Sequence, residues 1–133
     1  MKMITKMIMA IAFSVGLLGI PNILAERDYD PKTVETVGGT VLSVEKITVA
    51  NRRGYLVQVM LQTNKEIIPV HLGPAWFIVK ETPRIDANDT ISVTGSRMMF
   101  DGRQVIVAAD IAKGNEVLKL RQDNGVPFWP LHH

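Results

Sequence analysis

The stretch from Ile67 to Glu81, IIPVHLGPAWFIVKE, constrains the fold of this chain more than any other part of it. We expect a strand over 66–72 that leads into this stretch. The chain then breaks at Gly73-Pro74 and continues as a short, almost wholly apolar segment. Proline suits the first position of a helix, where its missing N–H is not needed. We therefore expect a helix over Ala75–Glu81. Two turns are unstable alone, so this helix must be buried against the rest of the domain.

Segments with strand character lie on both sides of this unit. Alternating apolar and polar residues predict half-buried strands over Val34–Val49 and Tyr55–Gln62. After the helix, we expect further strands over Thr90–Thr94, Gln104–Ile111 and Val117–Arg121. The pair Gly38-Gly39 predicts a bulge or sharp bend inside the first strand.

This order of elements predicts an all-β fold with one short helix. Five or six strands, with the helix between the third and the fourth, match the OB-fold, a partly open Greek-key barrel. We expect a single domain over 26–133 that ends in a tail rich in proline and aromatic residues.

The N-terminus predicts export. Lys2 and Lys6 form a positive region, and an apolar run follows to Ile20. Ala25 is the small residue expected directly before a cleavage site, so we expect cleavage after it. The apolar run is shorter than the roughly 20 residues of a spanning helix. We therefore expect residues 1–25 to be a signal peptide and the mature protein to be periplasmic or secreted. The alternative is an uncleaved N-terminal anchor.

Charge and cysteine content narrow the classes of function. Removing Lys2 and Lys6 from 15 Lys+Arg leaves 13 basic residues against 13 Asp+Glu, a formal balance of zero after cleavage. A nucleic-acid-binding protein usually carries a basic surplus, so this balance disfavours that class. The chain has no cysteine. This excludes disulfides, iron–sulfur clusters, cysteine-held zinc and the C-x-x-C-H attachment of haem.

Three motifs carry a resemblance to a family: HLGPAWF at 71–77, VTGSR at 93–97 and LRQDNGVPFW at 120–129. Together they resemble a group of small exported bacterial OB-fold proteins that are uncharacterised or labelled as nucleic-acid-binding. The resemblance covers nearly all of the mature chain and implies an exported binding domain. It implies no catalytic activity, because a fold by itself does not specify a chemistry.

His71 is the only histidine inside the predicted fold, since His132 and His133 are terminal. It lies just before the expected helix, whose N-terminus would favour an anion. Two interpretations are open: a ligand or metal contact at the surface of the barrel, or a packing histidine with one hydrogen bond. A lone histidine makes a poor metal site, which favours the second.

The two tryptophans also allow two interpretations each. Trp76, next to Phe77, is either part of an aromatic docking surface or part of a plug that closes one end of the barrel. The apolar character of the whole helix favours the plug. Trp129 lies in a stiff PFWP tail that either presents a motif to a partner or packs back on its own domain.

Several arginines are expected to line the face that OB-folds use for binding. We expect Arg52 and Arg53 in the loop between the first two strands and Arg103 in the loop between the fourth and fifth, with Arg97, Tyr55 and Phe100 near them. The alternative is that these arginines are solvated turn charges, which the neutral mature chain favours.

These observations predict a noncatalytic binding or accessory module without a cofactor. No serine–histidine–aspartate order, metalloprotease motif, phosphate loop or calcium loop is present in the sequence. The expected partner is another exported protein or a small ligand. One alternative is a nucleic-acid or oligosaccharide binder that uses the arginine and tyrosine residues. A second alternative is a haem- or metal-handling protein.

Overall fold

The structure is a computed structural model, and it describes residues 29–49 and 53–130. The expected signal peptide at 1–25, its cleavage site, Arg52 and the terminal histidines all lie outside these ranges.

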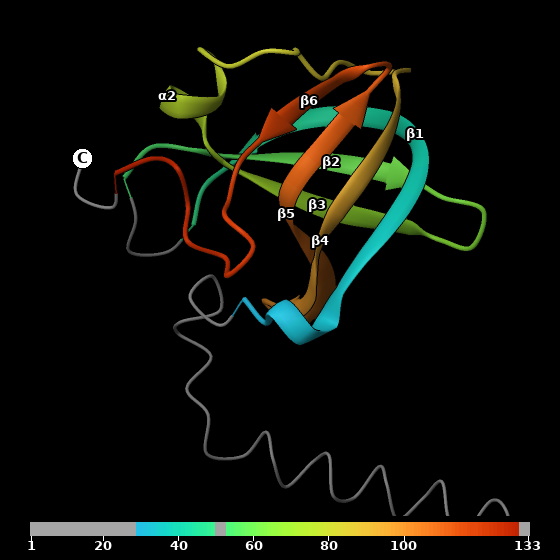
Figure 1. Ribbon diagram of the computed structural model, residues 1–133, viewed down its shortest axis with the longest axis horizontal. Coiled ribbons are helices and arrows are strands. Elements are labelled where there is room, and N and C mark those ends of the chain that lie inside the picture. Colours follow the sequence, from blue (N-terminus) through green and yellow to red (C-terminus); the bar gives the residue numbers. More distant parts are fainter. Residues whose placement is uncertain (1–28, 50–52, 131–133) are drawn as a thin grey trace, which may run out of the picture.

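Six strands and one short α-helix make up the described domain (Figure 1). After a short 3-10 turn at Pro31–Thr33, the elements follow in this order: β1 Val34–Ile47, β2 Leu56–Gln62, β3 Ile67–Pro74, α2 Ala75–Ile78, β4 Thr90–Phe100, β5 Arg103–Lys113 and β6 Glu116–Lys119. The strands form one sheet in the order β3-β2-β1-β4-β5-β6, with antiparallel neighbours. The expectation of an all-β fold with one short helix is confirmed.

One additional pairing joins strands that are not neighbours in this order. Val70 and His71 of β3 pair in parallel with Ile106 and Val107 of β5. The pairings β1–β2–β3–β5–β4 therefore return to β1, and inward-facing side chains from these strands meet in one core. This core includes Val41, Val59, Leu61, Val70, Leu72, Val93, Ile106, Ile111 and Leu120.

The helix is shorter than the expected Ala75–Glu81, because after Ile78 the chain continues in single turns. Lys80 N–H donates to the Phe77 carbonyl and Glu81 N–H to the Ile78 carbonyl, both across three residues. The side chains of α2 are partly buried and pack against the core. The helix thus begins at Ala75 as predicted but has fewer residues. The expected break at Gly73-Pro74 is wrong, because β3 continues through both residues and pairs with β2 there.

The expected bulge at Gly38-Gly39 is wrong in position. The register of β1 against β2 shifts between Val41 and Ser43, so Leu42 is the extra residue. Gly39 is needed for a different reason: a Cβ there would lie 2.3 Å from the carbonyl oxygen of Gln62. Only a residue without a side chain allows β2 to approach β1 this closely.

The end of β4 was also predicted incorrectly. The strand continues through Gly95 to Phe100 instead of ending at Thr94. A Cβ at Gly95 would lie 2.2 Å from the carbonyl oxygen of Val107, so this glycine permits close approach of β5 rather than ending the strand. The last strand also ends earlier than the expected Val117–Arg121. β6 ends at Lys119, and Arg121 lies beyond it in an isolated bridge to Pro127.

Candidate functional site

A small notch opens where the connection between β1 and β2 meets the C-terminal tail. It has a volume of about 40 Å³ and is lined by Val49, Arg53, Gly54, Tyr55, Leu56, Pro74 and Trp129. The Tyr55 side chain is 53% exposed, and Arg53 is exposed beside it. Three of the residues that the sequence singled out, Arg53, Tyr55 and Trp129, therefore come together at one place.

Local backbone contacts position this notch. Gly54 adopts a φ of 74°, a left-handed conformation that glycine takes at little cost, and this turns the chain into β2. The Tyr55 carbonyl accepts a hydrogen bond of 2.8 Å from the N–H of Ala75, the first residue of α2. The start of β2 is thereby tied to the strand–helix unit that organises the fold.

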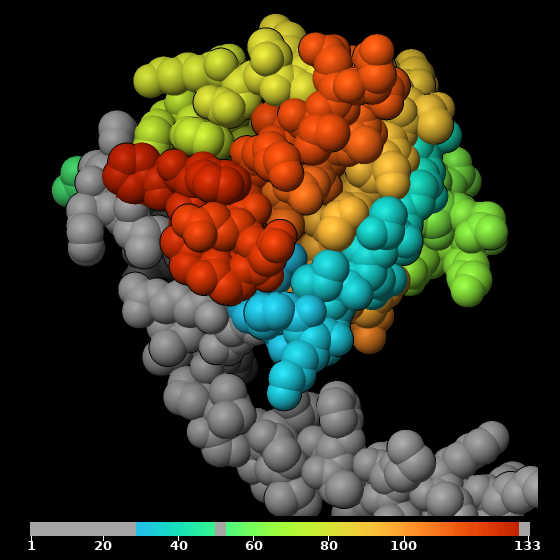
Figure 2. Space-filling model, viewed as in Figure 1, coloured from blue at the N-terminus to red at the C-terminus, as the bar shows by residue number. Residues whose placement is uncertain are grey.

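Trp129 packs back on its own domain. Its side chain is only 8% exposed, and its ring lies 5.2 Å from the ring of Phe77 in α2. The tail is held by a hydrogen bond of 3.0 Å from Phe128 N–H to the Leu120 carbonyl and by the Arg121–Pro127 bridge. In Figure 2 the red tail lies between the yellow-green helix segment and the orange strands. Trp129 thus contributes only a small part of its surface to the notch.

Arg121 is the residue at this site that the sequence reasoning missed. It is buried, its guanidinium lies 4.9 Å from the centre of the Trp129 ring, and its Nη1 donates to the Ala108 carbonyl at 2.6 Å. Cations over an indole face are attracted to its negative electrostatic surface. The only available signal was the spacing of an arginine and a tryptophan in LRQDNGVPFW, which does not reveal that the tail folds back.

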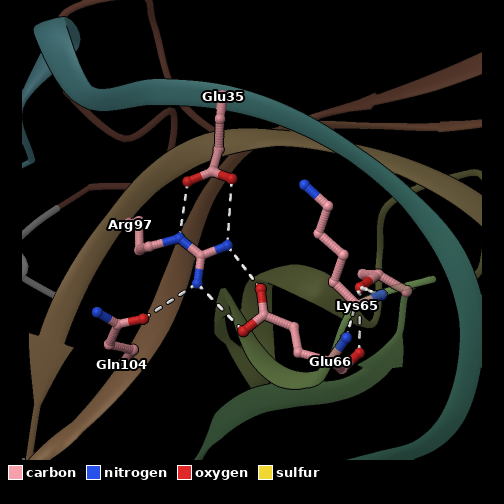
Figure 3. A network of polar contacts seen from close by, with 6 residues as sticks. Glu35, Lys65, Glu66, Arg97 and Gln104 are labelled. Atoms are coloured by element: carbon pink, nitrogen blue, oxygen red, sulfur yellow. Dashed lines mark hydrogen bonds and ion pairs between the residues drawn. The ribbon is translucent and has the colours of Figure 1, made fainter.

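Arg97 lies in a separate polar cluster, shown in Figure 3. Its guanidinium donates to Glu35 through Nε at 2.8 Å and Nη2 at 3.2 Å, to Glu66 through Nη2 at 2.8 Å, and to Gln104 through Nη1 at 3.1 Å. The hydrogen bonds from Arg97 lower the pKa of Glu35, and those to Glu35 and Glu66 raise the pKa of Arg97. The cluster borders a polar cavity of about 330 Å³ that Lys65, Thr36 and Asn64 also line. Arg97 is therefore engaged within the protein rather than placed beside Arg53.

Replacing Arg97 with methionine should lower the free energy of unfolding by about 1 kcal/mol at neutral pH and low salt. The loss is modest because the pairs are partly exposed and solvent screens them. The folded-state pKa of Glu35 is depressed, so this stabilisation is present above its unfolded value and disappears as the pH falls through the folded value. Urea unfolding at pH 7 and pH 3 measures the difference.

Arg84→Met is the matched control for this prediction. The Arg84 side chain is 80% exposed and reaches Asp86 only at 3.7 Å, so its removal should change stability by less than about 0.5 kcal/mol. Equal losses for the two variants would show that the Arg97 cluster does not tie β1 and β4 to the turn before β3.

His71 is buried on β3 with 1% of its surface exposed. Its Nε2 lies 3.1 Å from Oε1 of Gln58, and its ring meets Phe100 edge-on at 4.7 Å. Because the Gln58 oxygen accepts, the proton sits on Nε2, and Nδ1 has no hydrogen-bond partner in the described part of the chain. Burial, and then the positive charge of Arg121, lower the pKa of His71 to about 4. His71 is therefore neutral at pH 7 and enclosed.

The remaining predicted site residues are dispersed. Trp76 is half-buried on α2 and lies edge-on to Phe77 at 6.1 Å. Phe100 contacts His71, and Arg103 is an exposed residue at the start of β5 rather than in a loop. Arg52 belongs to the residues that the structure does not describe. The arginines therefore do not form one continuous face in the ranges that are described.

Two further observations concern metals and membranes. Within 29–49 and 53–130, no group of three or more histidine, aspartate or glutamate side chains is arranged to hold a metal ion. In the same ranges, no helix has the length and apolar character needed to cross a bilayer.

Comparison with known proteins identifies one family. The model of the MamS/MamX magnetosome protein family matches residues 33–118, a range that begins just before β1 and ends within β6. The tail that carries Arg121 and Trp129 lies beyond the matched range. No curated protein matches the chain.

Proposed function

The chain belongs to the MamS/MamX magnetosome protein family, and from this premise we propose that it serves the magnetosome as an exported, noncatalytic binding module with an OB-fold. Its partner is another exported protein, which it contacts at the notch beside Tyr55. The observation that carries this proposal is the exposed pair Arg53 and Tyr55 next to the apolar surface of Pro74 and Trp129.

The strand pairings support the OB-fold part of the proposal. A ring of pairings β1–β2–β3–β5–β4, a long curved first strand and a helix between β3 and β4 are the features of this small Greek-key barrel. The fold also agrees with the resemblance of the 71–77, 93–97 and 120–129 motifs to small exported OB-fold proteins.

The expected cleavage site is compatible with the packing of the described domain. Tyr29 is 7% exposed, and Asp30 N–H donates to Ser96 Oγ at 3.3 Å, so the first described residues pack against the domain. Only residues 26–28 separate them from the expected cleavage site after Ala25. Cleavage there would release the domain into the periplasm with all of its described packing contacts retained.

At the notch itself, the size of the site favours a protein partner over a small ligand, whereas the cavity beside Arg97, at about 330 Å³, has the size of a small-molecule pocket. Pockets for small molecules usually measure about 300–1,000 Å³, whereas this notch measures about 40 Å³. That volume suits one inserted side chain of a larger surface. Tyrosine and arginine are enriched among the residues that dominate protein–protein binding energy, and Tyr55 and Arg53 flank the notch here.

The two alternatives receive less support. A nucleic-acid or oligosaccharide face would need its arginines free, but Arg97 is already bound by Glu35 and Glu66. Haem or metal handling would need an accessible ligand, but His71 is enclosed and hydrogen-bonded to Gln58. The engaged Arg97 and the enclosed His71 both favour the protein partner.

Photo-cross-linking from position 55 tests the proposal. A photoreactive phenylalanine analogue is placed at Tyr55 in one strain and at Met99 in another, because both side chains are 53% exposed and Met99 lies on β4, outside the notch. We expect one discrete protein adduct from position 55 in magnetosome-producing cells, lost in the Arg53→Glu variant, and no such adduct from position 99. N-terminal sequencing of this chain, recovered without cross-linking from the same cells, should give a sequence that begins at Glu26.

Other outcomes would overturn parts of the proposal. Equal adducts from positions 55 and 99 would remove the notch as the binding site. A complex with nucleic acid that weakens steeply as salt rises would favour the phosphate-binding alternative. Recovery of the protein with Met1 retained in the membrane fraction would contradict cleavage.

A further inference from the structure

Within the described residues, the second half of β1 has a paired neighbour on one side only. Residues 34–40 pair with β4, and Val41 continues this contact through hydrogen bonds with Asn88 and Asp89. From Ser43 to Ile47 the strand pairs with β2, and no described residue pairs with its other edge. Figure 1 shows β1 curving away from β4 along this half. An unpaired strand edge presents backbone N–H and C=O groups that can bind another strand.

Apolar side chains are exposed along this open edge. Val44 lies opposite Val59, so the two side chains point to the same face of the sheet, and Val59 is fully buried. Val44 is nevertheless 42% exposed, because no described element covers the sheet beyond β1 at this point. Leu42, the extra residue of the bulge, is 43% exposed. An edge of this kind gains stability when another strand covers it.

We propose that this edge pairs with the same edge of a second copy of the chain, in an antiparallel arrangement with Val44 on the two-fold axis. Directly opposite side chains in a sheet point to the same face, whereas consecutive side chains along a strand point to opposite faces. A two-fold axis perpendicular to the sheet must therefore place one residue opposite its own copy, and not opposite the next residue along the strand. The proposal concerns the β1 edge and does not depend on the function proposed for the notch.

Charge selects Val44 as the residue on the axis. An axis through Glu45 or Lys46 would place two like charges directly opposite each other, which is destabilising. An axis through Ser43 would require Val41, whose backbone is already bonded to Asn88 and Asp89. An axis through Ile47 would pair residues beyond the end of β1. An axis through Val44 instead uses the stretch from Leu42 to Lys46 and places no like charges opposite each other.

The side chains are compatible with this register. It places Leu42 opposite the aliphatic stem of Lys46 from the second copy, and Ser43 opposite its Glu45. Within one chain the Ser43 hydroxyl already donates to Glu45 Oε2 at 3.0 Å, so the same pair of groups would meet again across the axis. The mature chain has a formal balance of zero, so two copies do not repel each other through net charge.

The extent of the contact predicts a weak dimer. Stable interfaces bury roughly 1,200–2,000 Å², and the free edge from Leu42 to Lys46 is too short to bury that area by itself. We therefore expect self-association at high micromolar concentration or on a surface that concentrates the protein.

Single-cysteine variants of the mature chain test the register, because the protein has no cysteine of its own. Val44→Cys is treated with a short bismaleimide at increasing protein concentration. Its matched control is Val117→Cys, a valine that is 47% exposed on the edge strand β6. We expect at least about tenfold more covalent dimer from Val44→Cys than from Val117→Cys, with a yield that rises with concentration.

A charge placed on the axis provides the second measurement. In sedimentation velocity, Val44→Lys should remove the dimer, while Val117→Lys should associate like the parent; thermal melts establish that both variants fold. Equal cross-linking of the two cysteine variants would overturn the proposal, as would a parent that stays monomeric up to millimolar concentration. Loss of a different protein partner in Val44→Lys, with a monomeric parent, would assign the edge to that partner and also overturn it.

Discussion

Replacing Trp129 with alanine is expected to lower the free energy of unfolding by about 3–5 kcal/mol, the usual cost of truncating a buried large aromatic side chain. Trp129 is 8% exposed and contacts Phe77 of the helix and Arg121. Its loss would open a cavity at the end of the core and remove the ring beneath the buried Arg121 guanidinium. Equilibrium unfolding in urea, followed by circular dichroism, measures the change.

Phe128→Ala is the control, because this neighbouring aromatic is 49% exposed and should cost less than about 1 kcal/mol. A Trp129→Ala protein as stable as the parent would mean that the tail does not pack on the domain in solution.

Gly73→Val extends this prediction into a double-mutant cycle. The φ of Gly73 is not among the positive values in the structure, so its backbone conformation does not exclude a branched residue. The constraint is space: a Cβ at Gly73 would lie 2.7 Å from the Trp129 ring. Valine there should destabilise the parent by about 1–3 kcal/mol and should cost much less when Trp129 is alanine. Additive effects would contradict the contact.

The second large effect is a loss of stability in acid that depends on His71. Burial, and then Arg121, lower the folded-state pKa of His71 to about 4, below its ordinary value of 6.5. The folded state therefore binds fewer protons than the unfolded state between these values. The stabilisation is fully present above pH 6.5 and is lost as the pH falls through 4. At about 1.4 kcal/mol per pKa unit, its upper bound is about 3.5 kcal/mol.

His71→Gln separates this effect from other acid-sensitive groups. The variant cannot titrate at position 71, so its stability should fall less than that of the parent between pH 7 and pH 4, by up to about 3.5 kcal/mol. His132 and His133 are present in both proteins and cancel in the comparison. Direct titration of the His71 imidazole by NMR provides a second check. A midpoint near 6.5, or identical pH profiles, would show that His71 is solvated in the native protein.

Local signals in the sequence determined most of the elements. The alternation in 34–49 and 55–62 predicted β1 and β2 nearly to their ends, because one side of each strand faces the core. Gly73-Pro74 indicated where the helix begins, but β3 continues through both residues, and Pro74 is the residue before the helix rather than its first residue. The order of these elements was sufficient for the all-β class. Export was predicted from residues outside the described ranges.

Tertiary structure alone decided which side chains meet. Arg97 and Glu35 are separated by 62 positions, and nothing local distinguishes such a pair from two solvated charges. The sequence predicted a bulge or sharp bend at Gly38-Gly39 and a strand that ended at Thr94, but Gly39 and Gly95 admit backbone from another strand. For Trp129, the sequence left a docking motif and a packed tail equally open. The contacts of its ring with Gly73, Phe77 and Arg121 show that the tail packs on the domain. Periodicity reports which face of a strand is buried, whereas the identity of its neighbour depends on how distant segments pack.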